Sequence, residues 1–306
     1  LDTLREECSI PVWHDDAQGT ACVTLAGLIN ALKLAEKKIE DVKIVMLGAG
    51  ASNTTIARLI IAAGGDPKKM HIFDSKGGLH TGRADIEADK RFYRKWELCE
   101  STNPQKIDTF AEACNGADVM IALSKPGPDT VKPEWIKTMA EKSIVFTCAN
   151  PIPEIYPYAA KEAGAFIAAT GRGDFPNQVN NSIGFPGILK GALLVRASKV
   201  TDKMAIAAAY SLANYAEKRG IDPENIVPTM DEAEVFPVEA ADVAMQAIKD
   251  GVARVEMTWD EAFQKAKKDI EYSRGMTKLV MDNGYIDAPG DDMLQDAIEW
   301  AIEKVK

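Results

Sequence analysis

"DVKIVMLGAGASNTTIARLIIAAGG", residues 41–65, decides the fold class of this chain. Residues 42–47 form a short apolar run with β-branched members, which is typical of a buried parallel strand. Glycines follow, and apolar residues then recur at helical spacing over residues 56–63. The next apolar run, residues 70–73, indicates a second strand that ends at Asp74. The stretch therefore predicts a strand–helix–strand unit with short connections.

The same alternation extends over residues 42–170 and predicts an α/β fold, a Rossmann-like doubly wound parallel sheet with flanking helices on both faces. Residues 76–105 interrupt it with a polar, charged excursion that holds some helix, and the pattern is mostly helical from residue 203 onward. Further helices are expected at 20–38, 107–116, 132–141, 156–164, 204–220 and 237–251, with a last pair inside 258–306, and further strands at 117–124, 143–151 and 165–171.

The composition argues against several classes of protein. The net charge of −10 and the pI near 5.0 disfavour nucleic acid as a partner, because phosphate binding needs a basic surface. The five cysteines are scattered without a CxxC pair and only three histidines are present, so we expect a reducing, cytoplasmic compartment and no structural zinc site. No apolar run reaches the ~18 residues of a membrane span, and no membrane partner is expected.

The turn after the first strand, "GAGASN", carries the features of a dinucleotide site. Gly48 permits a tight turn, and Gly50 lets the backbone approach a pyrophosphate. The helix that starts near Ala51 would direct its N-terminus at that anion. Asn53 stands where the fingerprint prefers Gly or Ala, so the packing of the helix on the strand must differ. The alternative is a glycine turn in a doubly wound fold whose site is unused.

The residue at the end of the second strand bears on the choice of cofactor. Asp74 would accept a hydrogen bond from the ribose 2′-OH, which favours NAD over NADP. Arg83, Lys90 and Arg91 follow it, and one of them could instead neutralise a 2′-phosphate. The alternative for these three is a solvated basic patch. The cofactor is therefore NAD or NADP, with NAD favoured.

Asparagines gather after the later strands. Asn150 ends a predicted strand directly before a proline, at the edge where open parallel sheets bind ligands. The loop "FPNQVNNSIGFPG" adds Asn177, Asn180 and Asn181. Amides can orient a carboxylate, a carboxamide or a hydroxyl without adding charge. The alternative for any one of them is the capping of a helix or turn.

Two adjacent carboxylates precede the first long helix. "IPVWHDDAQGTA", residues 10–21, places Asp15 beside Asp16. Like charges this close repel, so we expect a compensating group. The alternative is a surface turn in which an aspartate caps the helix N-terminus.

Five blocks of sequence together resemble the malic enzyme family, especially its shorter bacterial-type form. The resemblance covers residues 10–255 and implies oxidative decarboxylation of malate to pyruvate and CO₂ with NAD(P)⁺ and Mg²⁺ or Mn²⁺. It implies that Asp16 ligates the metal, whose charge offsets the paired carboxylates, and that Asp15 supports that site. The blocks are "IPVWHDDAQGTA", "LGAGASNTTIARLI", "FDSKG", "CANPIPEI" and "ATGRGDFPNQVNNSIGFPGILKGAL".

The resemblance further implies that Asn150 and Asn181 contact the substrate and the nicotinamide side of the pocket, with Asn180 as an adjacent candidate. The predicted domains are a segment leading in from an N-terminal domain (1–20), an NAD(P)-binding domain (21–255) and a helical C-terminal extension (256–306). The predicted catalytic set is Asp15, Asn150, Asn180 and Asn181, and the predicted cofactor-binding set is Gly48, Gly50, Ala51, Ser52, Asn53, Asp74, Ser124, Asn150 and Asn181.

Members of the family carry an N-terminal domain with a Tyr general acid, a Lys general base and a Glu-Asp pair for the metal, all upstream of the position where this chain begins. The start also lacks an initiator Met and the features of a signal peptide. We therefore expect a piece of a longer protein that binds dinucleotide but turns over little malate by itself. Alternatives are a dinucleotide-binding regulatory module without catalysis and another dehydrogenase of small acids or amino acids. The resemblance also implies a homodimer or larger homo-oligomer.

Overall fold

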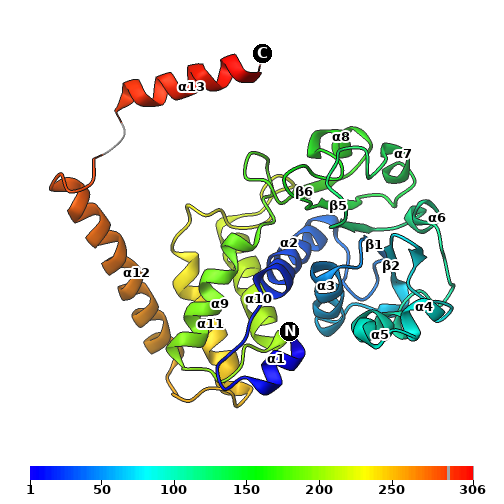
Figure 1. Cartoon of the computed structure of the whole chain (residues 1–306), viewed down its shortest axis with the longest axis horizontal. Coiled ribbons are helices and arrows are strands. Elements are labelled where there is room, and N and C mark those ends of the chain that lie inside the picture. Colours follow the sequence, from blue (N-terminus) through cyan, green and yellow to red (C-terminus); the bar gives the residue numbers. More distant parts are fainter. Residues whose placement is uncertain (288–289, 306) are drawn as a thin grey trace.

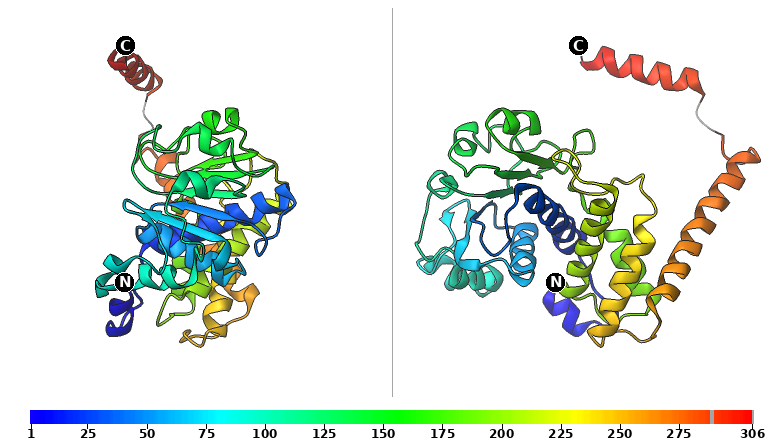
Figure 2. Two further views of the ribbon diagram at one scale, coloured as in Figure 1. Left: turned by 90° about the vertical axis from the view of Figure 1, so that its right-hand side faces the viewer. Right: turned by 180° about the vertical axis from the view of Figure 1, so that it is seen from behind.

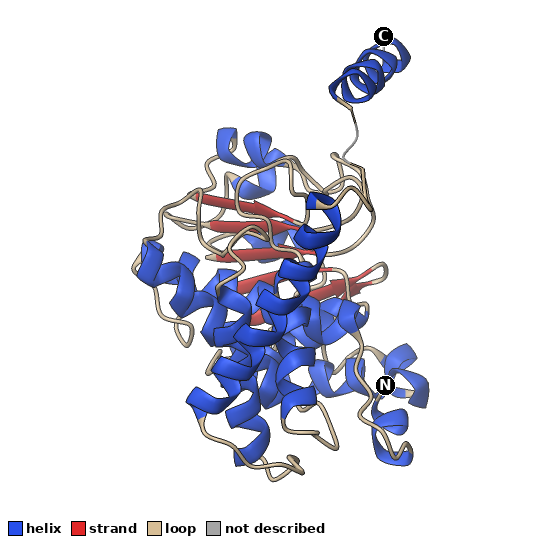
Figure 3. Ribbon diagram, turned by 90° about the vertical axis from the view of Figure 1, so that its left-hand side faces the viewer, coloured by secondary structure: helices blue, strands red, loops and turns tan. Residues whose placement is uncertain are grey.

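The computed structural model describes residues 1–287 and 290–305, and this part of the chain is built around one six-stranded sheet. The strand order is β3-β2-β1-β4-β5-β6, so the chain runs outward in both directions from the border between β1 and β4. Five strands are parallel, and β3 is antiparallel to β2 (Figure 3). The strands are β1 (Ile44–Leu47), β2 (Met70–Asp74), β3 (Gly77–Gly78), β4 (Val119–Ala122), β5 (Ile144–Thr147) and β6 (Ile167–Thr170).

Alternate side chains of the strands enter two separate cores. Ile44 and Met46 belong to one core, and Val45 belongs to the other. The strands are thus buried on both faces, which explains the continuous apolar runs in the sequence. This burial confirms the predicted parallel sheet with helices on both faces. The first core packs against α2 (Thr20–Ala35), α3 (Ala51–Ala62), α9 (Phe185–Leu194), α10 (Asp202–Arg219) and α11 (Val235–Lys249), and the second against α6 (Phe110–Cys114), α7 (Pro133–Ile136) and α8 (Pro157–Glu162) (Figure 1).

The excursion at 76–105 contains some helix, as the polar pattern predicts, in α4 (Ala84–Glu87) and α5 (Tyr93–Ser101). It also contains β3, which the pattern does not predict. Gly77 has φ +131°, and a Cβ at Gly78 would lie 2.1 Å from the carbonyl oxygen of Ile107. Two glycines therefore let the chain turn back beside β2, and such a strand carries no apolar alternation.

Several helices are shorter than the sequence pattern predicts, and the largest differences are in α6 and α7. α6 stops at Cys114, just before Gly116, which has φ +67°. α7 stops at Ile136, and the carbonyl of Thr138 accepts the N–H of Gly116 at 2.9 Å instead of continuing a helix. The two chain segments thus bond to each other ahead of the interior strands β4 and β5, a contact that helical spacing cannot reveal.

The chain ends in helices that lie apart from the sheet. α1 (Asp2–Glu7) opens the chain and buries no residue. α12 (Trp259–Asp282) buries only Ala262 and Ala266, and α13 (Asp291–Val305) extends beyond it (Figures 1 and 2). The predicted last pair of helices is thus confirmed. Among the described helices, none combines the length and the apolar character that crossing a membrane demands.

Candidate functional site

A pocket lies at the carboxyl ends of β4, β5 and β6. Residues directly after each of these strands line it, together with residues from the start of α2, the first turn of α3 and the loop before α9. The border between β1 and β4, where the strand order reverses, is the place where open α/β sheets bind ligands. The lining residues are Asp16, Thr20, Ser52, Leu123, Ser124, Pro126, Cys148, Ala149, Asn150, Gly171, Val179, Asn180 and Asn181.

The glycine turn between β1 and α3 has the backbone that a bound pyrophosphate requires. Gly48 has φ +103°, and a Cβ there would lie 2.2 Å from the carbonyl oxygen of Leu123. A Cβ on Gly50 would meet no atom within 4 Å, so this glycine faces open space. Among the residues that the structure describes, no side chain caps the N-terminus of α3, which leaves its first N–H groups for an anion. The local structure therefore fits a dinucleotide.

The next residues of α3 take three different positions. Ala51 is exposed on the first turn. Ser52 lines the pocket, and its hydroxyl donates to the carbonyl oxygen of Asp16 at 2.7 Å. Asn53 is buried, and its Nδ2 donates to the carbonyl oxygens of Leu47 and Gly48 at 2.9 Å each. This amide bonds the helix to the end of β1, which is how the structure accommodates a side chain larger than Gly or Ala.

The two aspartates occupy a short π-helix, η1 (Asp15–Gly19), that precedes α2. Asp15 Oδ2 accepts from Asn181 Nδ2 at 2.5 Å, while its Oδ1 is buried without a hydrogen-bond partner among the described residues. Burial, followed by the charge of Asp16, raises the pKa of Asp15. Asp16 is exposed on the pocket wall. The group that compensates Asp15 is thus, in part, the amide of Asn181, while the carboxylate of Asp16 stays open to the pocket.

Those carboxylates fit one part of a cation site. Oxygen ligands suit Mg²⁺ or Mn²⁺, and Asp16 presents such oxygens on the pocket wall, whereas the unpartnered Oδ1 of Asp15 is buried. Across residues 1–287 and 290–305, however, no group of three or more His, Cys, Asp or Glu side chains could hold a metal ion. The described residues therefore offer a partial coordination shell at most.

The asparagines divide into pocket residues and a structural one. Asn150, Asn180 and Asn181 line the pocket. The amide of Asn180 also donates to Gly171 O and accepts from Ser182 N–H, at 3.0 Å each. Asn177 is buried, and its amide bonds the end of β6 to the loop after α10 at the carbonyl oxygens of residues 168 and 223. The capping alternative therefore describes Asn180, which is the N-cap of the short 3₁₀-helix Asn181–Ile183 and also lines the pocket. Asn177 instead joins distant segments.

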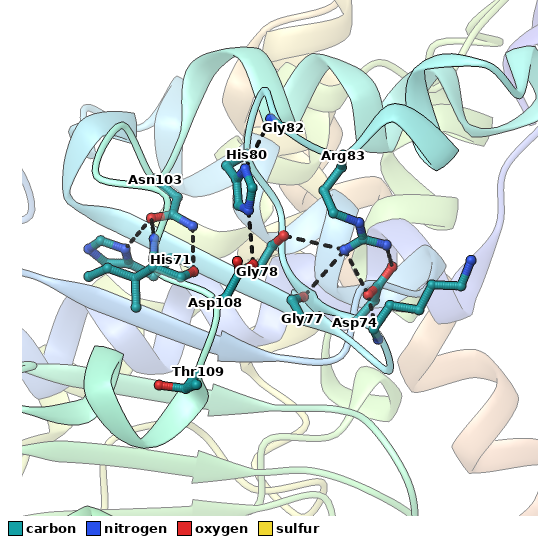
Figure 4. A network of polar contacts seen from close by, with 12 residues as sticks. His71, Asp74, Gly77, Gly78, His80, Gly82, Arg83, Asn103, Asp108 and Thr109 are labelled. Carbon is teal, nitrogen blue, oxygen red and sulfur yellow. Dashed lines mark hydrogen bonds and ion pairs between the residues drawn. The ribbon is translucent and has the colours of Figure 1, made fainter.

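The end of β2 holds a charged network (Figure 4). Arg83, only 8% exposed, donates Nη1 and Nη2 to the two carboxylate oxygens of Asp74 at 3.0 Å each, and Nε to Asp85 at 2.8 Å. Burial would raise the pKa of Asp74, but the hydrogen bonds from Arg83 and from the Lys76 N–H outweigh it, so the pKa is lowered. Arg91 instead pairs with Asp89 at 2.6 Å.

One buried acid next to the pocket stands in no sequence pattern that predicts its role. Glu154 has 0% exposure, and its Oε1 accepts from the Ser124 N–H at 2.7 Å. Its Oε2 accepts from the Ala149 N–H at 3.1 Å. The only sequence signal is an acid within the apolar, proline-rich stretch that follows a strand. No local spacing rule connects it to Ser124, which is thirty residues away.

Comparison with known proteins gives a consistent result. Residues 17–249 match the family model described as "Malic enzyme, NAD binding domain". The chain is 39% identical to "NADP-dependent malic enzyme" of Halomonas elongata and 40% identical to "NAD-dependent malic enzyme" of Geobacillus stearothermophilus, in each case over 82% of this chain. It spans 61% and 51% of those two proteins.

The fold comparison agrees with the sequence comparison. The crystal structure of Entamoeba histolytica malic enzyme superposes on 100% of this chain with a TM-score of 0.97 and 64% sequence identity. This chain covers 63% of that one.

Proposed function

The chain belongs to the malic enzyme family, and we propose that it supplies the dinucleotide site and a metal ligand for the oxidative decarboxylation of malate to pyruvate and CO₂. One observation carries the proposal. Asp16, Ser52, Asn150 and Asn181, which come from four distant segments, line a single pocket beside the glycine turn. A reaction that takes a hydride and a carboxylate from one small acid needs its cofactor and its charge-stabilising group in one place.

The residues of the chain divide the work as follows. The Gly48–Gly50 backbone and the N-terminus of α3 bind the pyrophosphate. Asn150 and Asn181 orient malate and the carboxamide of the nicotinamide by hydrogen bonds. Asp16 holds Mg²⁺ or Mn²⁺, with Asp15 supporting it. Such a cation, when bound, stabilises the negative charge that develops on the substrate oxygen as CO₂ leaves.

For the cofactor we favour NAD over NADP. The carboxylate of Asp74 sits at the end of β2, where it would accept a hydrogen bond from the ribose 2′-OH and repel a 2′-phosphate. Arg83 reduces that repulsion, because both of its terminal nitrogens bond Asp74. Titrations with NADH and NADPH measure the preference directly. Tighter binding of NADPH would contradict this part of the proposal.

Replacement of Asp16 by Asn tests the metal assignment. Water-proton relaxation reports Mn²⁺ binding even when it is weak, and NADH fluorescence reports the dinucleotide. We expect the variant to lose Mn²⁺ binding and to keep its affinity for NADH. Asp174→Asn is the control, because Asp174 is an exposed loop acid paired with Arg172. Equal Mn²⁺ binding by wild type and Asp16→Asn would contradict the assignment.

The reaction itself is tested by product stoichiometry. The chain is incubated with malate, NAD⁺ and Mn²⁺, and pyruvate and NADH are measured together. We expect slow turnover by this chain alone, with the two products in equal amounts. Pyruvate without NADH would argue against the oxidative route. A chain that binds NADH but responds to neither malate nor Mn²⁺ would favour the regulatory module.

A further inference from the structure

Glu154 joins two loops that are separate in sequence. It lies between β5 and α8, and its carboxylate is completely buried. Oε1 accepts the N–H of Ser124 at 2.7 Å and the Ser124 hydroxyl at 3.2 Å. Oε2 accepts the N–H of Ala149 at 3.1 Å. One side chain therefore bonds the loop after β4 to the loop after β5.

The chemistry of these contacts specifies a carboxylate. The Ser124 and Ala149 amides can only donate, and they approach opposite oxygens of the acid. An ionised carboxyl group accepts on both oxygens, whereas a glutamine accepts on one and presents an N–H on the other. With glutamine, one backbone N–H would face another donor. A buried donor that loses its acceptor in this way is costly.

The two loops line the part of the pocket that lies beyond β4 and β5, on the opposite side of β1 from β2. Leu123, Ser124 and Pro126 come from one loop, and Cys148, Ala149 and Asn150 from the other. A dinucleotide that places its adenosine ribose at the end of β2 and its pyrophosphate at the glycine turn reaches β4 and β5 with its other end. Glu154 therefore acts on the nicotinamide half of the site.

We propose that Glu154 is a positioning residue that sets the Ser124 and Asn150 loops against the nicotinamide of the bound dinucleotide. The inference rests on the proposed function, since it needs a dinucleotide in this pocket. It concerns loop geometry alone, because Glu154 is buried behind Ser124 and Ala149 and does not line the pocket itself.

Glu154→Gln tests the proposal through a comparison of two ligands. NADH carries a nicotinamide, whereas ADP-ribose carries only the adenosine, pyrophosphate and ribose parts. We expect the Kd for NADH to rise roughly tenfold or more, since a charge-assisted hydrogen bond is lost, and the Kd for ADP-ribose to stay within about twofold. Glu154→Asp, which keeps the charge but is one methylene too short to reach both loops, is expected to show the same selective loss.

The matched control is Thr147→Val. The Thr147 hydroxyl donates to the carbonyl oxygen of Ile155 at 3.0 Å, so this change also removes a buried hydrogen bond from the β5–α8 segment, but not one that reaches the pocket. We expect both dissociation constants to stay within about twofold of wild type. Thermal melts by circular dichroism check that each variant is folded.

Two outcomes would overturn the inference. Folded Glu154→Gln and Glu154→Asp variants that bind NADH as wild type does would show that the loops need no such contact. A parallel loss of NADH and ADP-ribose binding would show a general structural role. Failure of the wild-type chain to bind either ligand is a different result: it would overturn the proposed function, and this inference with it.

Discussion

The two halves of the candidate site are stabilised by opposite kinds of polar contact. At the end of β2, the buried cation Arg83 donates to two carboxylates, Asp74 and Asp85. At the pocket, buried or half-buried carboxylates accept from neutral groups: Asp15 from the amide of Asn181, and Glu154 from backbone N–H groups. Lys76 also pairs with Asp85, and Lys95 lies 3.6 Å from Asp74, so cations offset both carboxylates of the first half. In the second half, the donors to Asp15 and Glu154 are uncharged. The pocket half is accordingly the one suited to chemistry.

The largest expected effect is the loss of stability on replacing Gly48, which the fold requires, compared with replacing Gly50, which only the site requires. Gly48→Ala forces φ +103° on alanine and places its Cβ 2.2 Å from Leu123 O, so we expect it to destabilise the chain by roughly 3 kcal/mol and to abolish NADH binding. Gly50→Ala meets no atom and should leave the melting temperature near wild type while weakening NADH binding. Thermal melts and NADH titrations measure both. Equal stability losses in the two variants would remove the distinction.

A smaller effect is expected where an amide compensates a carboxylate. Asn181→Ala leaves both oxygens of Asp15 without a protein donor, which should lower the free energy of unfolding by about 1–3 kcal/mol in urea. Asn150→Ala is the control, because Asn150 is exposed and forms no side-chain hydrogen bond to the described residues. We expect it to change stability by no more than about 0.5 kcal/mol. A larger loss in Asn150→Ala than in Asn181→Ala would contradict the compensation.

The smallest effect is a difference in the sign of the pH dependence. The pKa of Asp74 is lowered from 3.8, so near and below this pH the folded chain binds fewer protons at Asp74 than the unfolded chain does. The stabilisation that Asp74 contributes is therefore lost as the pH falls below about 3.8. Burial raises the pKa of Glu154 above 4.5 despite its hydrogen bonds. Between pH 4.5 and that raised pKa, the folded state holds a proton that the unfolded chain has released, so the stability falls as the pH rises through this window, and the carboxyl group is ionised above it.

Urea unfolding from pH 3 to 7 of wild type, Asp74→Asn and Glu154→Gln measures these contributions. The difference between wild type and Asp74→Asn should shrink toward the acid end. As the pH rises, the free energy of unfolding of wild type should fall relative to that of Glu154→Gln. Two differences that change in the same direction would show that the two halves are not electrostatically distinct.

The first half of the site could be predicted from the sequence because its signals are local. The strand at 42–47, the glycines and Asp74 lie within about thirty residues, and each position has its own conformational requirement. Even here the pairing of Asp74 with Arg83 was missed, because the sequence showed Arg83 only as one of three basic residues. β3 was missed as well, since its two glycines have no periodicity.

The pocket half depends on contacts between distant residues, which the sequence does not display. Asp15 and Asn181 are 166 positions apart, and only the resemblance to a family placed them in one site. Asn177 and Asn181 look equivalent in the sequence, yet one bonds loops together and the other bonds Asp15. Glu154 could not be assigned, because its role follows from three donors that become neighbours only when β4 and β5 pair.

The hydrogen bond from Ser52 to the backbone of Asp16 joins the first turn of α3 to the residue proposed to bind the cation. If the bound dinucleotide shifts the first turn of α3, this hydrogen bond would shift the Asp16 peptide as well, and a bound cation would act on α3 through the same contact. Such coupling is reciprocal: the factor by which the dinucleotide changes the affinity for the cation equals the factor by which the cation changes the affinity for the dinucleotide.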